Sequence, residues 1–288
     1  MTMQDQALSY CAREVRRFDH DRFLTALFAP ADRREDLFAL YAFNLEVAKT
    51  REVVSEPTLG LIRLQWWRET VEKAARGEPP RHEVAEPLAA AIARHRLDRA
   101  LLDRLIDARE ADLDDDPPAD LTCLINYARV TGGPVTQLAV QVMGGGVMGV
   151  GEAAAMQAAG HVGMAWALTG ILRAIPFLAR AHRHRLPADL LATHGVTEPM
   201  LFELKPEPGL RAVVRVVADA ARAELTAARA LRRSVRKAAL PALLPAALAD
   251  LYLKALAGEG YDPFAPRLHM PHPFRQIKLG WAAVTGRW

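Results

Sequence analysis

Proline residues divide this 288-residue chain into segments that can each form a helix. A proline inside a helix removes a backbone hydrogen bond and clashes with the preceding turn. Pro30, Pro57, Pro187 and Pro241 therefore mark places where helices begin or end. Between the prolines, apolar residues recur at three- and four-residue steps, and Ala, Leu and Arg dominate while runs of β-branched residues are sparse. The sequence predicts an all-α fold.

The predicted helices are spread over the whole chain, without the repeat period that is typical of solenoid proteins. They cover residues 4–17, 19–28, 31–54, 57–76, 84–95, 98–113, 120–143, 151–180, 187–193, 208–238 and 241–258. The chain length fits one large helical core. We predict a helical domain at residues 1–260, followed by a proline-rich C-terminal arm at 261–288 that ends in a short amphipathic segment.

The charge pattern of the chain restricts its partners. Lys and Arg number 37 against 34 Asp and Glu, which gives a formal net charge of +3, and the two signs are interspersed. This pattern gives no reason to expect nucleic acid as a partner. It is compatible with a peripheral contact to an anionic membrane, although solubility alone also explains it.

The N-terminus and the cysteines indicate the compartment. The first residues are charged and lack the apolar core of a signal peptide. Cys11 and Cys123 lie far apart, without the spacing of a zinc site or a disulfide framework. We therefore expect a cytoplasmic protein.

One predicted helix, at residues 31–54, has an inward face that includes Tyr41, Asn44, Ala48 and Glu52. A helix that binds a diphosphate through Mg²⁺ needs two carboxylates one turn apart, because hard oxygen ligands at that spacing share the cations that neutralise the phosphates. Glu52 alone does not supply both carboxylates.

Two segments carry a resemblance to a known family. FALYAFNLEVAKTRE (residues 38–52) and GMAWALTGILRAIPFLARAHRHRLP (163–187) resemble the two substrate helices of the squalene/phytoene synthases, which are head-to-head prenyltransferases. The match continues through QWWRETVE, YARVTGGPV, HGV and GYDPFAPR in the family's order. The resemblance implies the isoprenoid synthase fold, a single-domain helical bundle around a central cavity.

Both metal motifs of the family are degenerate in this chain. Ala48 and Lys49 stand where the first motif has paired aspartates, and Glu52 is the one acid retained. Gly170, Ala174 and Leu178 stand where the second motif has an asparagine and two aspartates. The resemblance therefore implies the fold but not Mg²⁺-dependent ionisation of an allylic diphosphate. We expect no catalytic residues, no metal and no other cofactor. If the protein is active after all, we expect a prenyltransferase that uses Mg²⁺.

Residual ligand binding is a separate hypothesis. The candidate ligand-binding residues are Tyr41, Lys49, Arg51, Glu52, Arg173 and Arg180. Their basic side chains suit direct contact with a diphosphate or another prenyl or lipid ligand. The same side chains equally suit a charged helix surface. The sequence leaves both interpretations open.

The degeneracy resembles that of one branch of the family, whose members act in assembly of respiratory complex I, the NADH dehydrogenase. Residues 42–72 resemble this branch more closely than they resemble active synthases; their sequence is AFNLEVAKTREVVSEPTLGLIRLQWWRETVE. The resemblance implies a pseudoenzyme that binds complex I subunits or assembly proteins, with a peripheral contact to the inner membrane. The arm at 261–288 and a basic helix at 228–239 are the predicted contact surfaces. The alternative is a prenyl-diphosphate transferase or isoprenoid-binding protein with a degenerate active site.

Two further patterns have alternative interpretations. Asp112, Asp114, Asp115 and Asp116 form an acidic cluster that two prolines terminate, and we interpret it as a solvated helix end rather than a metal site. The adjacent pair Trp66–Trp67 requires that at least one indole is buried, either in ordinary core packing or along a prenyl-chain cavity.

Overall fold

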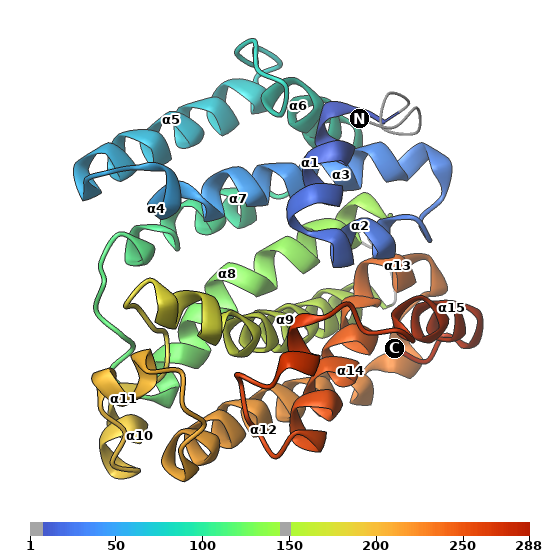
Figure 1. Ribbon diagram of the computed structural model, residues 1–288. Helices are drawn as coiled ribbons and strands as arrows, with labels where there is room; N and C mark the ends of the chain where they lie inside the picture. Colours follow the sequence, from blue (N-terminus) through green and yellow to red (C-terminus); the bar gives the residue numbers. More distant parts are fainter. Residues whose placement is uncertain (1–7, 145–150) are drawn as a thin grey trace.

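The computed structural model describes residues 8–144 and 151–288, and the regular structure of these residues is entirely helical (Figure 1). The first half of the chain forms α1 (Tyr10–Phe18), α2 (His20–Ala26), α3 (Ala31–Ala48), α4 (Thr50–Val53), α5 (Pro57–Ala75), α6 (Ala85–His95) and α7 (Arg99–Asp107). The second half forms α8 (Leu121–Val142), α9 (Glu152–Arg180), α10 (Ala188–Thr193), α11 (Glu198–Phe202), α12 (Pro208–Ala230), α13 (Leu240–Leu243), α14 (Pro245–Gly258) and α15 (Arg275–Thr285). Short 3-10 helices lie at η1 (Glu110–Asp112), η2 (Arg232–Ser234), η3 (Lys237–Ala239) and η4 (Pro266–His269). The predicted all-α class is confirmed.

Local side chains explain where several helices begin. Asp98 and Asp120 each accept a hydrogen bond from a backbone N–H in the first turn of α7 and α8, and Ser9 does the same for α1. Such caps satisfy donors that have no partner within the helix. Pro57 and Pro208 occupy first positions of α5 and α12, where a missing N–H costs nothing.

The bundle has two halves that face each other across α8 (Figure 1). In one half, α3 packs against α1, α6 and α8; in the other half, α9 packs against α8, α12 and α14. One continuous apolar core runs from α1 to the C-terminal residue, and it includes Leu279, Ala282 and Trp288 of the C-terminal arm. The arm is thus packed on the body of the bundle.

Close contact between α8 and α9 depends on two glycines. A Cβ atom on Gly132 would lie 2.1 Å from the carbonyl oxygen of Gly163, and a Cβ on Gly163 would lie 2.2 Å from that of Gly132. No side chain fits between the two backbones at this point. The glycines therefore set how closely the two central helices approach.

Three predicted helices end earlier than the sequence indicated. The helix predicted at 208–238 ends at Ala230, so only the first three residues of the basic stretch at 228–239 are in an α-helix, and the rest contains η2 and η3. Like charges stand four residues apart there, Arg232 with Arg236 and Arg233 with Lys237, and such pairs destabilise an α-helix.

The other two early ends are at Ala48 and Asp107. The helix predicted at 31–54 breaks after Ala48, where the N–H of Lys49 approaches the carbonyls of both Leu45 and Val47. The helix predicted at 98–113 ends at Asp107 and continues as η1. Helix boundaries of this kind depend on tertiary contacts rather than on apolar periodicity.

Helix α9 is long and apolar enough to cross a membrane, the only such single helix in the described part of the chain. In its most apolar window, 56% of the residues are buried inside the protein. It is the central helix of the bundle, in contact with α8, α12 and α14.

We predict opposite effects of two alanine substitutions in α9. Gly163→Ala should lower the free energy of unfolding by about 3 kcal/mol, because the new methyl group meets the α8 backbone. Gly170→Ala should raise it by roughly 0.5–1 kcal/mol, because a Cβ at that position meets nothing within 4 Å and alanine favours a helix. Urea unfolding of both variants measures the difference, and equal effects would contradict the close contact.

Candidate functional site

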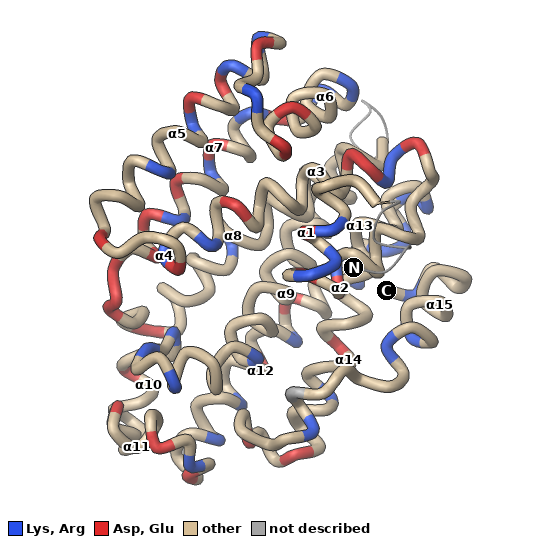
Figure 2. Tube along the Cα trace, turned by 45° about the horizontal axis from the view of Figure 1, so that its top comes forward, with Lys and Arg blue, Asp and Glu red and all other residues tan. Residues whose placement is uncertain are grey.

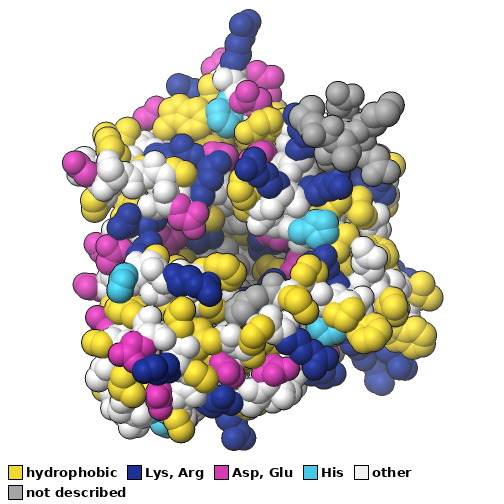
Figure 3. Space-filling model, in the orientation of Figure 1, with side chains coloured by type: hydrophobic (Ala, Val, Ile, Leu, Met, Phe, Trp, Pro, Cys, Tyr) yellow, Lys and Arg dark blue, Asp and Glu magenta, His cyan; other side chains and the backbone are white. Residues whose placement is uncertain are grey.

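A cavity of about 190 Å³ lies between the two halves of the bundle. Both predicted substrate helices reach it, α3 through Asn44 and α9 through Gly170. The other lining residues are Arg22, Arg109, Tyr127, Thr131, Gly132, Trp166, Ala167 and Ile171. Two of these side chains are guanidinium groups, and none is a carboxylate. Figure 3 shows the molecule hollowed between its two halves, with Lys and Arg side chains at the rim.

A second cavity of about 370 Å³ adjoins the first at Gly170. It lies between α9 and the C-terminal arm, and Arg173, Ala174 and Tyr252 are among its lining residues. The degenerate positions Gly170 and Ala174 therefore face open space rather than packed side chains.

Asp21 of α2 holds one side of these cavities together. Its carboxylate is buried and pairs with Arg173 at 3.1 Å and with Arg275 at 2.8 Å. The Tyr252 hydroxyl donates to the same carboxylate at 2.8 Å, and burial, followed by the charge of Asp21, raises the pKa of Tyr252 to about 12. The Arg173 guanidinium also lies 4.0 Å from the centre of the Tyr252 ring. Four elements, α2, α9, α14 and α15, thus meet at one carboxylate.

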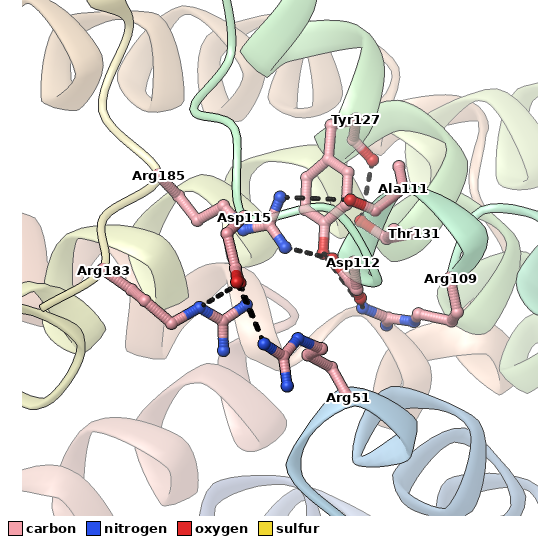
Figure 4. Close-up of polar contacts among 9 residues, drawn as sticks. All are labelled: Arg51, Arg109, Ala111, Asp112, Asp115, Tyr127, Thr131, Arg183 and Arg185. Carbon is pink, nitrogen blue, oxygen red and sulfur yellow. Dashed lines mark hydrogen bonds and ion pairs between the residues drawn. The ribbon is translucent and has the colours of Figure 1, made fainter. Parts of the chain in front are cut away.

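Asp112 holds the opposite side (Figure 4). The Tyr127 hydroxyl donates to it at 2.7 Å, and Arg109 and Arg185 pair with it at 3.2 and 3.0 Å. Burial raises the pKa of Tyr127 to about 12. The interpretation of the acidic cluster as a solvated helix end is wrong for Asp112, which is buried because the adjacent arginines compensate its charge. It is confirmed for Asp114 and Asp116, which are exposed.

Asp115 connects the two halves nearer the surface (Figure 4). It pairs with Arg51 of α4 at 3.0 Å and with Arg183, which follows α9, at 2.9 Å. The hydrogen bond from Arg51 is the main reason that the pKa of Asp115 is lowered. Because Asp115 is exposed, the pair orients Arg51 more than it stabilises the fold.

Glu46 of α3 binds the cations next to the first degenerate motif. Its carboxylate forms ion pairs with Lys49, one turn along the chain, and with Arg63 of α5. Glu46 itself is buried. Lys49 therefore neutralises a carboxylate of the protein at the position where the family motif has an aspartate.

Asp21, Glu46, Asp112 and Asp115 have one feature in common. Each of these carboxylates pairs with two basic side chains. The eight cations are Arg173 and Arg275, Lys49 and Arg63, Arg109 and Arg185, and Arg51 and Arg183. The two cavities are lined by four of the protein's guanidinium groups and by no carboxylate; the four are Arg22, Arg109, Arg173 and Arg275, which pair with Asp19, Asp112 and Asp21. The surroundings of the cavities therefore favour anions over metal cations.

The comparisons with known proteins agree with this fold. The family model for squalene/phytoene synthase matches residues 15–275. The chain belongs to the squalene/phytoene synthase family. A dehydrosqualene synthase crystal structure superposes with a TM-score of 0.80 over 96% of this chain and 95% of that one, at 18% sequence identity. The predicted isoprenoid synthase fold, a helical bundle around a central cavity, is confirmed.

Relatives within the family include assembly factors as well as synthases. The NADH dehydrogenase (ubiquinone) complex I assembly factor 6 of Bos taurus is 34% identical over 270 residues, which cover 94% of this chain and 80% of the relative. The phytoene synthase of Thermus thermophilus is 29% identical over 268 residues, which cover 92% of this chain and 88% of the relative.

The residues at the family's metal motifs do not fit Mg²⁺. Ala48, Gly170, Ala174 and Leu178 offer no side-chain oxygen, and Lys49 brings a positive charge that Glu46 neutralises. Within residues 8–144 and 151–288, no group of three or more His, Cys, Asp and Glu side chains is placed to hold a metal. Mg²⁺ requires several oxygen ligands in near-octahedral geometry, so these positions do not form the family's site.

Of the six candidate ligand-binding residues, Arg173 lines a cavity, whereas the other five are not among the lining residues of the two cavities described above. Lys49, Arg51 and Arg173 each pair with a different carboxylate, as described above. The remaining three are Tyr41, Glu52 and Arg180. Tyr41 is buried under the Arg22 guanidinium, 5.5 Å from the ring centre, and burial raises its pKa to about 12. Glu52 and Arg180 are exposed.

Sequence reasoning missed the residues that organise the site. Asp21, Arg22, Arg109, Tyr127 and Tyr252 line the cavities or bind the residues that do. Tyr127 could have been found from the sequence, because it begins the segment YARVTGG, which carries part of the family resemblance. Asp21 carries no comparable signal, since its partners lie 152 to 254 residues away in the sequence.

We predict that the buried Asp112 contributes more to stability than its exposed neighbour. Asp112→Asn leaves Arg109 and Arg185 without a counter-charge and should lower the free energy of unfolding by roughly 3 kcal/mol. Asp114→Asn is the matched control and should change it by less than about 0.5 kcal/mol. Urea unfolding of the two variants tests this, and a similar loss in both would contradict the buried network.

Proposed function

We propose that the protein is a non-catalytic member of the squalene/phytoene synthase family that acts in assembly of respiratory complex I by binding partner proteins. One observation carries the proposal: the carboxylates around the cavities bind the protein's own cations, and the motif positions supply none. The similarity to complex I assembly factors over 94% of the chain supports the same conclusion.

Loss of the acids removes the driving force for the family's chemistry. Ionisation of an allylic diphosphate places charge on the leaving group, and bound cations stabilise that charge in the transition state. Here Gly170 and Ala174 face the second cavity without any ligand for such a cation. The proposal therefore assigns no metal, no cofactor and no turnover to these positions.

An exposed apolar stripe on α5 is a suitable surface for a protein partner. Leu59, Ile62 and Trp66 lie three and four residues apart and project from the same side of the helix. Trp66 is held edge-on to Trp67, with ring centres 4.8 Å apart, and lies 5.3 Å from the ring of His82. A tryptophan that is already ordered loses little entropy when it binds a partner. We call these three residues the α5 stripe.

The charges near the α5 stripe favour a protein partner over a lipid surface. The helix carries both signs, and its arginines are paired: Arg63 with Glu46, and Arg68 with Asp107 and Glu110. A polar rim of both signs around an apolar centre is typical of protein interfaces. The proposed partners are complex I subunits or other assembly proteins, and the proposed location is the cytoplasm, in association with the inner membrane.

We predict that deletion of the gene from its source organism lowers the amount of assembled NADH dehydrogenase. Wild type should restore it, whereas the double variant Leu59→Ser, Ile62→Ser should bind its partner about tenfold more weakly or worse and restore less. Leu61→Ser is the matched control, because Leu61 and Leu59 are both 46% exposed but Leu61 lies outside the stripe. Native gels of membrane extracts and NADH oxidation measure the result.

The experiment tests the proposed role in complex I assembly and the role of the α5 stripe separately. Unchanged complex I activity and subunit levels after deletion would contradict the proposed function. Full restoration by the double variant would contradict only the role of the α5 stripe.

A second candidate function is binding of a prenyl diphosphate or a similar isoprenoid, with or without residual transferase activity. The observation that favours it is the open space beside Gly170 and Ala174, with Arg22, Arg109 and Arg173 in its lining. These guanidinium groups suit a phosphate, and the apolar lining residues suit a hydrocarbon chain.

A further inference from the structure

Helix α15 is fixed to the body of the protein by its inner face. Leu279 and Ala282 are fully buried in the common core. Arg275 reaches Asp21 at 2.8 Å, and the carbonyl oxygen of Trp288 accepts a hydrogen bond from Arg229 at 3.0 Å. The orientation of the helix is therefore determined, and so is the face that it turns outward.

The outward face of α15 is apolar. Phe274, Ile277, Trp281 and Val284 follow one another at steps of three, four and three residues, so they form one stripe. Their exposed fractions are 61, 68, 62 and 88%. A helix on the surface of a soluble protein normally turns polar residues to water. Large side chains that are exposed together in this way mark a contact site.

A hollow with apolar and charged lining residues lies beside α15, next to the residues that follow α2. Phe28 and Ala283 of α15 line the same hollow, of about 420 Å³, together with Lys237 and Ala238. Phe28 is itself exposed. We call the four stripe residues of α15 the α15 surface.

Basic residues border the α15 surface. Residues 266–288 contain Lys and Arg but no Asp or Glu, and in Figure 2 α15 carries blue positions without red ones. Three of these basic residues, Arg267, Arg275 and Lys278, pair with carboxylates of the body of the protein. The loop at 232–237 adds Arg232, Arg233, Arg236 and Lys237, and none of these forms an ion pair with a carboxylate in the described part of the chain. Lys237 lies beside Ala283 of α15 in the shared hollow. Asp32 and Arg33 line the same hollow, so its charged lining, with Lys237, has a net positive charge.

We infer that the α15 surface binds an anionic lipid bilayer. The helix lies in the plane of the interface, with Phe274, Ile277, Trp281 and Val284 inserted among the acyl chains near the headgroups. The basic loop at 232–237 contacts lipid phosphates. Trp and Phe beside Arg and Lys are the residues that favour this depth in a membrane.

The charges favour a lipid surface over a second copy of the protein. A symmetric dimer through the α15 surface would place the two basic loops close to each other, and like charges across an interface oppose binding. The arginines beside the α5 stripe, Arg63 and Arg68, are neutralised by carboxylates, whereas the basic residues of the loop at 232–237 form no ion pair in the described part of the chain. The two apolar surfaces therefore suit different partners.

Flotation of the full-length protein with lipid vesicles tests this inference. The protein should float with vesicles of phosphatidylcholine and phosphatidylglycerol, and much less with phosphatidylcholine alone. The double variant Ile277→Ser, Trp281→Ser should bind at least about tenfold more weakly. Ile62→Ser is the matched control, because Ile62 is 61% exposed and Ile277 is 68% exposed, and it should bind as wild type does.

A second pair of variants tests the charges. Arg233→Gln and Arg236→Gln should each weaken binding to the anionic vesicles by about fivefold, and added salt should reduce the difference. Equal binding of wild type to neutral and anionic vesicles would overturn the inference, and so would no binding to either. Gel filtration that shows a dimer which Ile277→Ser, Trp281→Ser dissociates would overturn it in favour of self-association. Each result is independent of the deletion phenotype that tests the proposed function.

Discussion

Two buried carboxylates beside the cavities, Asp21 and Asp112, connect segments that lie far apart in the chain. Asp21 pairs with Arg173 and Arg275, and Asp112 pairs with Arg109 and Arg185. A buried carboxylate is costly unless its charge is paired, so Asp21 and Asp112 depend on the arginines around them. An acid that binds a divalent metal cannot serve two guanidinium groups at the same time. The structure therefore uses its carboxylates to hold the fold, whereas the family motifs use theirs to bind Mg²⁺.

The protein keeps the fold of the family although the aspartates of both metal motifs are replaced. The central helices α8 and α9 approach closely at Gly132 and Gly163, and cavities remain beside the degenerate positions Gly170 and Ala174. What distinguishes the exterior is a pair of exposed apolar surfaces, one on α5 with neutralised charges and one on α15 with a basic border. Together they suit a protein that contacts a membrane and another protein at the same time.

The sequence predicted those features that depend on local patterns. The helices that carry the motifs, and the family itself, follow from residues 38–52 and 163–187 because both motifs are continuous in the chain. The carboxylate networks could not be predicted in this way, since Asp21 meets Arg275 across 254 residues and Arg51 meets Asp115 across 64. Prediction from apolar spacing also failed at Ala230, where like charges end a helix whose periodicity continues.

We propose that the carboxylates beside the cavities bind the protein's own cations and leave no site for metal-assisted ionisation. The most direct measurement is pyrophosphate release from farnesyl and geranylgeranyl diphosphate by the purified protein in the presence of Mg²⁺ or Mn²⁺. A phytoene synthase assayed in parallel provides the positive control. We predict release no faster than in buffer, whether or not the substrates bind and raise the melting temperature. Metal-dependent release that exceeds the buffer rate would contradict the account.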